Sequence, residues 1–553
     1  MSAARRPPRG CPTDPGAAVS VQLANVLRAV AVLQRRGMIN LTNPVEILTA
    51  AKALRHYGSF GGLVSYTAAR YADSPALTDD QGTLTFRQLD RMSNAVARVF
   101  LDDHLGAGST VGLLNRSHRG VLIGLAGAGK AGVRTVLLNT GFAGPQLRDV
   151  CVREGVGLVL ADQEFAELCT ALPEDVHVTL NWVEDAHTQP TLDERASSQS
   201  VDRMPYPPRP GGLVLLTSGT TGTPKGAPRD RISPLQSAQL LDRIPWPANG
   251  SYVVAAPLFH ATGLATASVG LALGNRIVLA RRFDPLAVLT AIERHRAGAV
   301  ILVPTMLSRI LDLGPDVVGR YDTSSLRVIF AAGSALSPQV CRRTLQTFGD
   351  VLYNLYGSTE VATAAVATPQ ELRIAPGTVG RPPVGCRIAA YDSRDRLITQ
   401  PGQSGTLYVS SGLSFSGYTD GGGKRVLDGL MSSGDTGHFD DRGLWYVDGR
   451  DDDMIVSGGE NVYPVEVENL LVEHPAIIEA AVVGVPDQDF GQRLRAFVVV
   501  RVGAALDADG VRMYVRSRLA RHKVPRDVVF LDALPRNETG KVLKRNLLAG
   551  VAE

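Results

Sequence analysis

The sequence has few cysteines and no cluster of them. Among 553 residues there are five, which are odd in number and widely scattered: Cys11, Cys151, Cys169, Cys341 and Cys386. No pair has the spacing of a metal site, and disulfide frameworks belong to short secreted chains. The pattern therefore predicts reduced thiols in a cytoplasmic protein.

The sequence also has little net charge and no long apolar run. A net charge of +3, with no dense basic stretch, gives no reason to expect nucleic acid as a partner. The apolar stretch from Val21 to Leu33 is short and is interrupted by Asn25 and Arg28. Because a membrane-spanning helix needs about 20 apolar residues, this stretch does not span a bilayer. It predicts an amphipathic helix that packs on the body or makes peripheral membrane contact.

The hydrophobic pattern predicts an α/β protein of several units. Short β-branched runs alternate with helical spacing up to about Gly385, which indicates layered α/β subdomains with buried parallel strands. Short strands with glycine-rich turns follow and indicate a β-rich subdomain. After Arg450 the pattern is that of a small α+β unit. We expect a flexible tail at 1–20, a large domain at 21–449 with a helical extension to about residue 60, and a small mobile domain at 450–553.

One glycine-rich segment resembles a phosphate loop only superficially. Gly124 to Gly132 reads GLAGAGKAG and matches two nucleotide-loop spacings, with Lys130 in the Walker position. Ala131 stands where a hydroxyl should hold Mg²⁺, and a strand pattern follows Gly132 directly, so no helix opens on these glycines. We expect instead the end of a small-residue helix packed on the sheet.

A second loop has the chemistry that the first lacks. The apolar run Leu213–Leu216 leads into Thr217-Ser218-Gly219-Thr220-Thr221-Gly222-Thr223-Pro224-Lys225-Gly226. Its glycines let several backbone N–H groups converge on one anion, while its hydroxyls donate hydrogen bonds and Lys225 adds a positive charge. This loop predicts a phosphate site. It closely resembles the phosphate loop of the adenylate-forming superfamily, which includes acyl-CoA synthetases, firefly luciferase and peptide-synthetase adenylation domains.

The resemblance runs from about Ser65 to Leu548 and assigns further roles. The motif 354–360 resembles the family's adenine and metal motif, and Gly333-Ser334-Ala335 is a weaker match to its adenine segment. The resemblance places the nucleotide at Asn354, Tyr356, Gly357 and Thr359 and gives Mg²⁺ to Glu360. An aromatic ring can stack on adenine, and a carboxylate is a ligand that Mg²⁺ prefers.

Later motifs complete the implied site. Asp435 and Arg450 correspond to the family's ribose-binding residues, and Asp452 to its hinge. Gly458 and Gly459 lie in the strand that lines the family's pantetheine tunnel. His260, in Pro257-Leu258-Phe259-His260, corresponds to the acyl pocket, although it could equally be a buried histidine that fills space. Lys541 corresponds to the C-terminal lysine that binds the carboxylate and the α-phosphate.

The resemblance implies an acyl-CoA synthetase that uses ATP, Mg²⁺ and coenzyme A. Lys541, Glu360, Thr217 and Lys225 would carry the chemistry. The implied acid is a medium- or long-chain fatty acid, with an aromatic or short-chain acid as the second choice. The motifs are also compatible with an enzyme that loads an acyl carrier protein and with a nucleotide-binding regulator without catalysis. Oligomeric state is not readable from the sequence.

Overall fold

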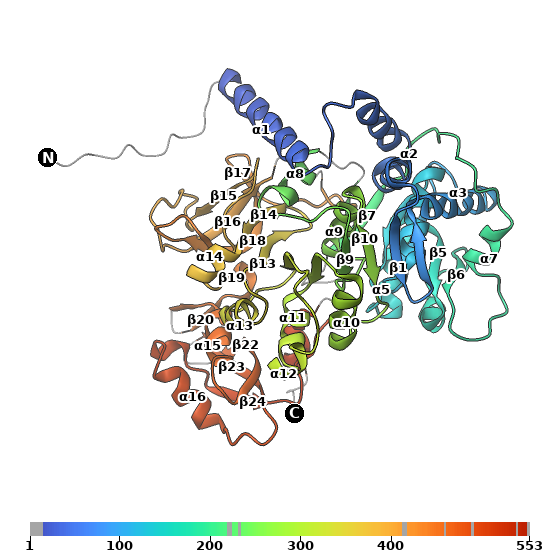
Figure 1. Ribbon diagram of the computed structural model, residues 1–553. Helices are drawn as coiled ribbons and strands as arrows, with labels where there is room; N and C mark the ends of the chain where they lie inside the picture. Colours follow the sequence, from blue (N-terminus) through green and yellow to red (C-terminus); the bar gives the residue numbers. More distant parts are fainter. Residues whose placement is uncertain are drawn as a thin grey trace.

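The structure, a computed structural model, describes residues 15–217, 224–229, 234–411, 417–457, 460–487, 491–537 and 540–549. Two large sheets with their helices come first and are interleaved along the chain, and the β-rich subdomain and the C-terminal α+β unit follow them (Figure 1). The C-terminal unit and α1 (Pro15–Arg35) lie at opposite ends of the view in Figure 1. The α/β fold with a β-rich subdomain and a small C-terminal domain is thus confirmed.

The first part of the chain builds two sheets that are parallel except at their edges. The eight-stranded sheet has the order β14-β13-β12-β11-β9-β10-β1-β2 and the six-stranded sheet the order β6-β5-β3-β4-β7-β8. In the first, the strands are β1 (Pro75–Asp79), β2 (Gly82–Thr85), β9 (Ser251–Val254), β10 (Arg276–Leu279), β11 (Ala299–Leu302), β12 (Val328–Ala332), β13 (Leu352–Ser358) and β14 (Ala362–Ala367). In the second, they are β3 (Thr110–Leu114), β4 (Arg134–Leu137), β5 (Val156–Asp162), β6 (His177–Trp182), β7 (Leu213–Thr217) and β8 (Lys225–Pro228). The central strands are buried on both faces, as their uninterrupted apolar runs predict.

Helices cover these sheets, and many begin at a proline. They are α2 (Pro44–Tyr71), α3 (Phe86–Asp102), α4 (Arg119–Ala131), α5 (Gly144–Glu154), α6 (Ala166–Cys169), α7 (Leu192–Ser197), α8 (Pro234–Asp242), α9 (Ala261–Ala272), α10 (Pro285–His295), α11 (Pro304–Leu311), α12 (Pro315–Val318), α13 (Pro338–Phe348) and α14 (Pro369–Ile374). Proline suits the first helical position because that N–H has no partner within the helix. α3 begins with a capping box in which the side chains of Thr85 and Gln88 each accept a hydrogen bond from the other's backbone N–H.

The later part of the chain forms two smaller sheets. The antiparallel sheet of the β-rich subdomain contains β15 (Arg387–Tyr391), β16 (Gly405–Ser410), β17 (Val426–Leu427), β18 (Leu430–Phe439) and β19 (Trp445–Arg450). The C-terminal sheet contains β20 (Ile455–Ser457), β21 (Glu460–Val462), β22 (Ile477–Asp487), β23 (Gly491–Val500) and β24 (Asp527–Phe530). α15 (Pro464–Leu471), α16 (Ala508–Arg516) and α17 (Lys544–Ala549) belong to this last unit. The chain passes from one sheet to the other through the 3₁₀ turn Asp451–Asp453.

The rejected phosphate-loop look-alike lies in α4, a buried helix. A Cβ on Gly127 would lie 2.7 Å from Val96, and one on Gly129 would lie 2.7 Å from the carbonyl oxygen of Tyr57. These glycines therefore let α2 and α3 approach closely. Gly132, with φ +78°, ends the helix. The expectation of a packed small-residue helix is confirmed, although helices as well as the sheet pack against it.

The N-terminal region differs from the sequence prediction. The sequence predicts a tail up to residue 20, but α1 begins at Pro15, because proline at the first position and the alanines that follow favour a helix. The extension was expected to end near residue 60, whereas α2 continues to Tyr71 and is broken within itself at Gly58 (φ +73°, ψ −176°). This conformation is open to glycine and strained for other residues, so the break falls at that position.

Cys151, Cys169 and Cys341 are buried free thiols, and Cys386 is a partly buried one. Among the residues described, none of the helices has the length and apolar character needed to cross a membrane.

Candidate active site

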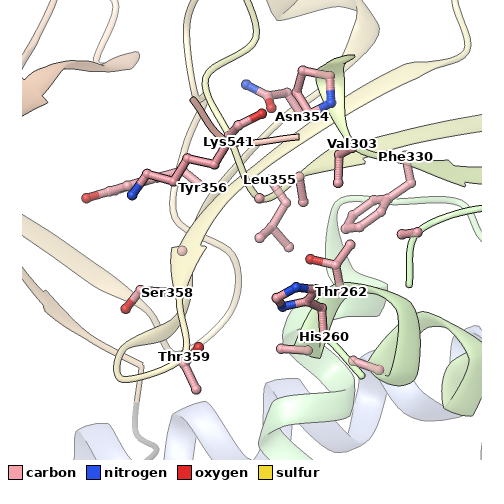
Figure 2. Close-up of a pocket in the computed structure, with 18 of the residues that line it drawn as sticks. His260, Thr262, Val303, Phe330, Asn354, Leu355, Tyr356, Ser358, Thr359 and Lys541 are labelled. Carbon is pink, nitrogen blue, oxygen red and sulfur yellow. The ribbon is translucent and has the colours of Figure 1, made fainter. Parts of the chain in front are cut away.

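One large cavity brings most of the candidate residues together. It has a volume of about 1850 Å³ and lies where the large sheets, the β-rich subdomain and the C-terminal unit meet. The candidate residues that line it are Lys225, His260, Gly333, Ser334, Ala335, Asn354, Tyr356, Gly357, Thr359, Glu360, Asp435, Arg450 and Lys541. In the view of Figure 2, Lys541 and Tyr356 lie on one side of the cavity, and His260 and Thr262 on the other.

The expected phosphate loop connects two paired strands. Thr217 ends the buried strand β7 and lies opposite Lys225, which begins β8 in antiparallel register. Ser218, Gly219, Thr220, Thr221 and Gly222 lie outside the described residues. The loop follows a buried strand, as expected, and its ends are held together by the β pairing.

The side chain of Lys225 faces an acid and an aromatic ring. Its Nζ lies 3.2 Å from a carboxylate oxygen of Asp420 and 5.0 Å from the centre of the Tyr418 ring. Both partners belong to the Gly-rich stretch 417–423 of the β-rich subdomain. The expected phosphate-binding lysine is therefore held at the cavity edge by a partly exposed ion pair, which an incoming anion can replace.

Glu360 is a partly buried carboxylate fixed by two hydroxyls. Tyr418 Oη donates to Glu360 Oε1 at 2.5 Å, and Ser358 Oγ donates to Oε2 at 2.8 Å. Burial alone would raise the pKa of Glu360, but these hydrogen bonds outweigh it and hold that pKa below its usual value. Glu360 is thus an anion at neutral pH, and each of its oxygens retains a lone pair for a cation.

The backbone before Glu360 is tightly packed. A Cβ on Gly357 would collide with the carbonyl oxygen of Ala362. Arg229 donates to the carbonyl oxygen of Thr359. Burial lowers the pKa of Arg229, while the nearby Glu360 carboxylate opposes that shift. These contacts hold the turn between β13 and β14 and thereby the direction of Glu360.

A cleft for a flat ring lies beside Gly333. Gly333 has φ +94°, and a Cβ there would meet only Val303 and Thr262 at 3.6 and 4.0 Å, so the backbone leaves open space. The Ser334 hydroxyl is buried and, among the described residues, has no hydrogen-bond partner. Asn354 Nδ2 donates to the carbonyl oxygen of Thr378 at 3.4 Å, which leaves the amide oxygen available to accept. An unpaired hydroxyl and an amide beside open space suit a ligand with both donors and acceptors.

Asp435 and Arg450 face each other across two strands. They are directly paired in the register of β18 and β19, with Arg450 Nη1 3.7 Å from Asp435 Oδ1. Tyr356 Oη donates to Asp435 Oδ2 at 2.6 Å. Burial, and then the Asp435 charge, raises the pKa of Tyr356 well above its usual value, so its hydroxyl remains a donor. The carboxylate is positioned to accept from hydroxyl groups in the cavity.

His260 lies at the start of α9 and on the cavity wall. Its Nε2 is buried and, in the part of the chain described, has no hydrogen-bond partner. Burial lowers the pKa of His260 to about 4, so the ring is neutral at pH 7. A neutral ring with an unpaired nitrogen aimed at a cavity suits contact with a ligand better than space filling.

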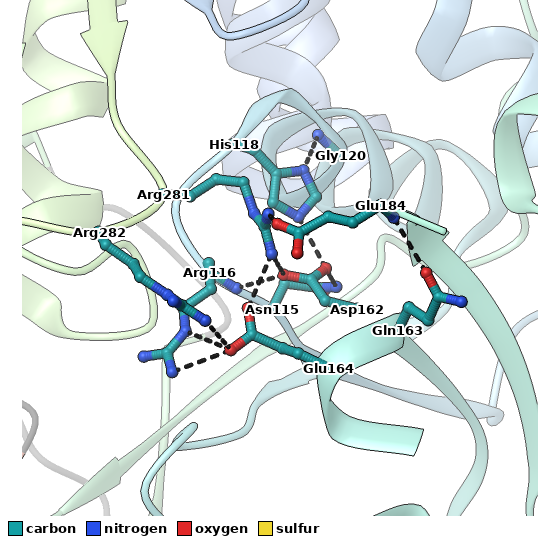
Figure 3. A network of polar contacts seen from close by, with 10 residues as sticks. All are labelled: Asn115, Arg116, His118, Gly120, Asp162, Gln163, Glu164, Glu184, Arg281 and Arg282. Atoms are coloured by element: carbon teal, nitrogen blue, oxygen red, sulfur yellow. Dashed lines mark hydrogen bonds and ion pairs between the residues drawn. The ribbon is translucent and has the colours of Figure 1, made fainter. Parts of the chain in front are cut away.

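A polar network behind this segment holds it in place. Leu258 N donates to Ser117 Oγ at 3.1 Å. Ser117 lies in the loop after β3, where the fully buried Asp162 accepts from Asn115 Nδ2 at 2.6 Å and from His118 Nε2 at 2.8 Å. Figure 3 shows the contacts of Asp162 with Asn115 and His118, and beside them Glu164 bonded to Arg116, Arg281 and Arg282. Because Arg281 and Arg282 follow β10, the network ties the two large sheets together and supports the strand-to-helix turn that carries His260.

A close approach between two domains brings Lys541 into the cavity. Gly540 has φ +74°, and a Cβ there would collide with Thr305 at the start of α11. Within the loop, Arg536 Nη1 donates to the carbonyl oxygen of Gly540 at 2.6 Å, and Lys541 N donates to Asn537 Oδ1 at 2.8 Å. The glycine lets the C-terminal loop touch the large domain, and the side chain that follows it enters the cavity.

Of the expected hinge and tunnel residues, the structure describes the position of the hinge residue Asp452. Asp452 lies in the 3₁₀ turn between β19 and β20. Gly458 and Gly459 lie outside the described residues. Among the described residues, no group of three or more His, Cys, Asp or Glu side chains could hold a metal ion.

Sequence reasoning missed Tyr418, Asp420 and Arg229, although all three contact candidate residues. Tyr418 and Asp420 stand in a stretch rich in glycine, Ser416 to Gly423, between two of the recognised motifs. An aromatic residue and an acid in such a stretch are the signal that could have found them. Arg229 gave no signal, since its contact with the turn at Thr359 spans 130 residues.

Comparisons with known proteins agree with this arrangement. Residues 64–419 match the AMP-binding enzyme family, and residues 466–541 match the AMP-binding enzyme C-terminal domain. The indoleacetate–CoA ligase of Aromatoleum aromaticum is 33% identical over 482 residues, which are 85% of this chain and 93% of that protein. The medium/long-chain-fatty-acid–CoA ligase FadD8 of Mycobacterium tuberculosis is 32% identical over 519 residues, covering 88% and 89%. The structure of ATP-bound MatB from Rhodopseudomonas palustris is similar with a TM-score of 0.78 and 26% identity, covering 89% of this chain and 99% of that one. Two matched domains and relatives of this extent show that the chain belongs to the AMP-binding enzymes, the adenylate-forming superfamily.

Proposed function

We propose that the protein is an acyl-CoA synthetase that activates a medium- or long-chain fatty acid as its adenylate and transfers the acyl group to coenzyme A. The observation that carries the proposal is the lining of the cavity. Past His260, residues of α9 line the cavity from Ala261 to Ala272, and we call this part of the cavity the apolar branch.

One face of α9 forms a smooth wall of that branch. Ala261, Ala265, Ser268, Val269 and Ala272 line it. Since a helix rises about 1.5 Å per residue, this wall is about 16 Å long. The Ser268 hydroxyl donates to the carbonyl oxygen of Leu264 at 2.8 Å within the helix, so it makes no demand on a ligand. Thr266, which also lines the cavity, donates to the carbonyl oxygen of Thr262 at 2.7 Å, and Thr262 lies at the His260 end of the helix. Beyond Thr262, a long wall whose hydroxyls bond within the helix suits an alkyl chain.

The donor set fits ATP and one Mg²⁺ ion. Mg²⁺ is usually held by one or two carboxylates together with substrate phosphates, and Glu360 is an anionic carboxylate on the cavity wall. Bound there, Mg²⁺ would neutralise phosphate charge. The base would lie in the cleft by Gly333 with Tyr356 against its face, and the ribose hydroxyls would donate to Asp435.

The chain's own groups would bring two anions together. The acid's carboxylate oxygen attacks the α-phosphorus of ATP, the bond from that phosphorus to the β-phosphate oxygen breaks, and pyrophosphate leaves. Lys541 would neutralise the carboxylate and the α-phosphate, while Lys225 and the loop that starts at Thr217 would hold the other phosphates. The neutral His260 would contact the carboxylate without adding charge.

The second step requires a different arrangement around the same site. The thiol sulfur of coenzyme A attacks the acyl carbonyl, AMP leaves, and the thiol proton passes to solvent. We expect the C-terminal domain to turn at Asp452, which withdraws Lys541 and presents the segment with Gly458 and Gly459 to the site.

The test is a panel of acids incubated with ATP, Mg²⁺ and coenzyme A, in which AMP release and the thioester are both measured. Saturated acids of increasing length should give both products with the highest kcat/KM. Higher values for aromatic or short-chain acids would refute the fatty acid assignment. Formation of the adenylate and of a thioester on an added acyl carrier protein, but not on coenzyme A, would refute coenzyme A as the acyl acceptor.

A further inference from the structure

A helical hairpin lines the apolar branch at the end away from the nucleotide residues. Tyr66 Oη donates to Glu46 Oε1 at 2.7 Å, although both residues belong to α2. In an unbroken helix, residues twenty positions apart would be separated by about 30 Å. The break at Gly58 therefore folds the second half of α2 back on the first. A Cβ on Gly62 would lie 2.5 Å from the Cα of Leu54, so glycine is needed where the halves meet.

An arginine holds this hairpin together at Tyr66. Arg70 Nη1 lies 3.0 Å from Glu46 Oε1 and donates to Tyr66 Oη at 2.9 Å. Arg70 Nη2 also donates to the carbonyl oxygen of Gly37 at 3.3 Å, in the connection from α1. Burial, and then the bond to Glu46, raises the pKa of Tyr66 to about 12, so its hydroxyl remains a donor. The polar atoms of the three side chains are thus directed at one another.

This cluster faces the cavity at the end away from the nucleotide residues. Glu46, Leu63 and Tyr66 line the cavity together with Val269 and Ala272 of α9. A Cβ on Gly274, just beyond α9, would lie 2.8 Å from the ring of Tyr71, the last residue of α2. The end of α2 therefore lies beside the end of α9, whereas His260 and Thr262 lie at the start of α9.

We propose that Tyr66, held in place by Glu46 and Arg70, is the stop against which the terminal methyl group of the acyl chain rests, so that the α2 hairpin sets the longest acid accepted. This inference rests on the proposed function and adds the residue that limits the length of the acyl chain. Glu46 precedes the segment that matches the AMP-binding family at 64–419, whereas Tyr66 and Arg70 lie at the start of that segment. The stop would thus join a residue outside the family match to two residues within it.

An acid that is too long must displace Glu46, Tyr66 and Arg70, whose polar atoms are hydrogen-bonded to one another. The hydrogen bonds among the three side chains leave the tyrosine ring as the surface that the chain end meets. One methylene too many in a fitted apolar pocket costs about 10-fold or more in kcat/KM. Removal of the ring should relieve that cost for long acids and change little for acids that do not reach it.

The experiment measures kcat/KM for adenylation across saturated acids of increasing length. Tyr66→Ala should raise the value for acids just beyond the wild-type optimum by about 10-fold relative to shorter acids. Glu46→Gln keeps the size of the side chain but weakens its bonds to Tyr66 and Arg70. It should shift the chain-length profile in the same direction as Tyr66→Ala, but by a smaller factor. Leu48→Ala is the matched control, because Leu48 is 69% exposed on the same hairpin. It should keep the wild-type profile.

An unchanged length profile in Tyr66→Ala would overturn the inference, and so would an equal loss for all acids, which indicates a structural role alone. If Tyr66→Ala does not fold, Tyr66→Leu, which removes the ring but keeps an apolar side chain, and Glu46→Gln decide by the same two criteria. A wild-type enzyme that adenylates no saturated acid would instead refute the proposed function, and this inference with it. If the wild-type enzyme adenylates saturated acids and the variants keep its chain-length profile, only the proposed role of Tyr66 is refuted.

Discussion

Two lysines that each directly follow a glycine have opposite surroundings. Lys130 of α4 is 1% exposed, and its Nζ lies 2.6 Å from Asp90, 2.7 Å from Ser93 and 2.8 Å from Asn94. Lys541 lies in a loop of the C-terminal domain and lines the large cavity. One ammonium group has its hydrogen bonds satisfied inside the fold, and the other belongs to a side chain that lines a large cavity.

The difference shows what a lysine near glycines means in physical terms. In α4 the glycines serve helix packing, and the lysine fastens α4 to α3. In the C-terminal loop the glycine serves a close approach between domains. The same Gly-Lys pair therefore predicts different effects of mutation at the two positions. A change of Lys130 should affect stability, and a change of Lys541 should affect activity.

The largest effect on activity is expected from Lys541→Ala. Loss of one electrostatic contact to the reacting groups typically costs about 10²- to 10³-fold in rate. Adenylation should fall by that factor, while thioester formation from supplied acyl-adenylate and the unfolding midpoint should remain. Equal loss of both half-reactions would contradict a role in adenylation alone.

Lys130→Met should act on stability. It removes a buried cation and leaves Asp90, Ser93 and Asn94 without that partner, which should cost about 2–3 kcal/mol of unfolding free energy. The measurement is urea unfolding of the large domain, with adenylation per folded molecule unchanged. Normal stability with lost adenylation would mean that α4 carries a phosphate site after all.

His260 should give the large domain a pH-dependent stability. Burial lowers the pKa of His260 to about 4, against about 6.5 in an unfolded chain. The unfolded state therefore takes up a proton first, and the stability contributed above pH 6.5 is lost as the pH falls toward 4. Between pH 7 and 4, wild type should lose about 2 kcal/mol relative to His260→Gln. Parallel stability curves for the two proteins would contradict a neutral, buried ring.

The smallest effect is expected from Asp420→Asn, which releases Lys225 from its ion pair. Because that pair is partly exposed, unfolding free energy should change by less than about 0.5 kcal/mol. The KM for ATP should fall by up to about threefold, since Lys225 no longer has a competing carboxylate. A rise in KM would mean that Asp420 itself helps to hold the nucleotide.

Most of the framework was predictable because its signals are local. The buried parallel strands have uninterrupted apolar runs, and the loop after β7 concentrates hydroxyls and glycines next to one lysine. The packed character of α4 also followed from a local feature, the alanine at position 131 in place of a hydroxyl.

The rest depends on contacts between residues distant in the sequence. The pair of Lys225 with Asp420 joins two subdomains, and the bond of Tyr66 to Glu46 requires a helix to fold back at Gly58. Nothing in the local pattern around Glu46 indicates that it lies beside Tyr66. Tertiary packing determines these positions, so the wall of the cavity built by the N-terminal segment emerged only from the structure.

The most direct test of the central claim is isotope exchange between labelled pyrophosphate and ATP, with Mg²⁺ present and coenzyme A omitted. The account predicts exchange that depends on an added fatty acid and is lost in Lys541→Ala. Exchange without any acid, or none with any acid in the panel, would contradict it.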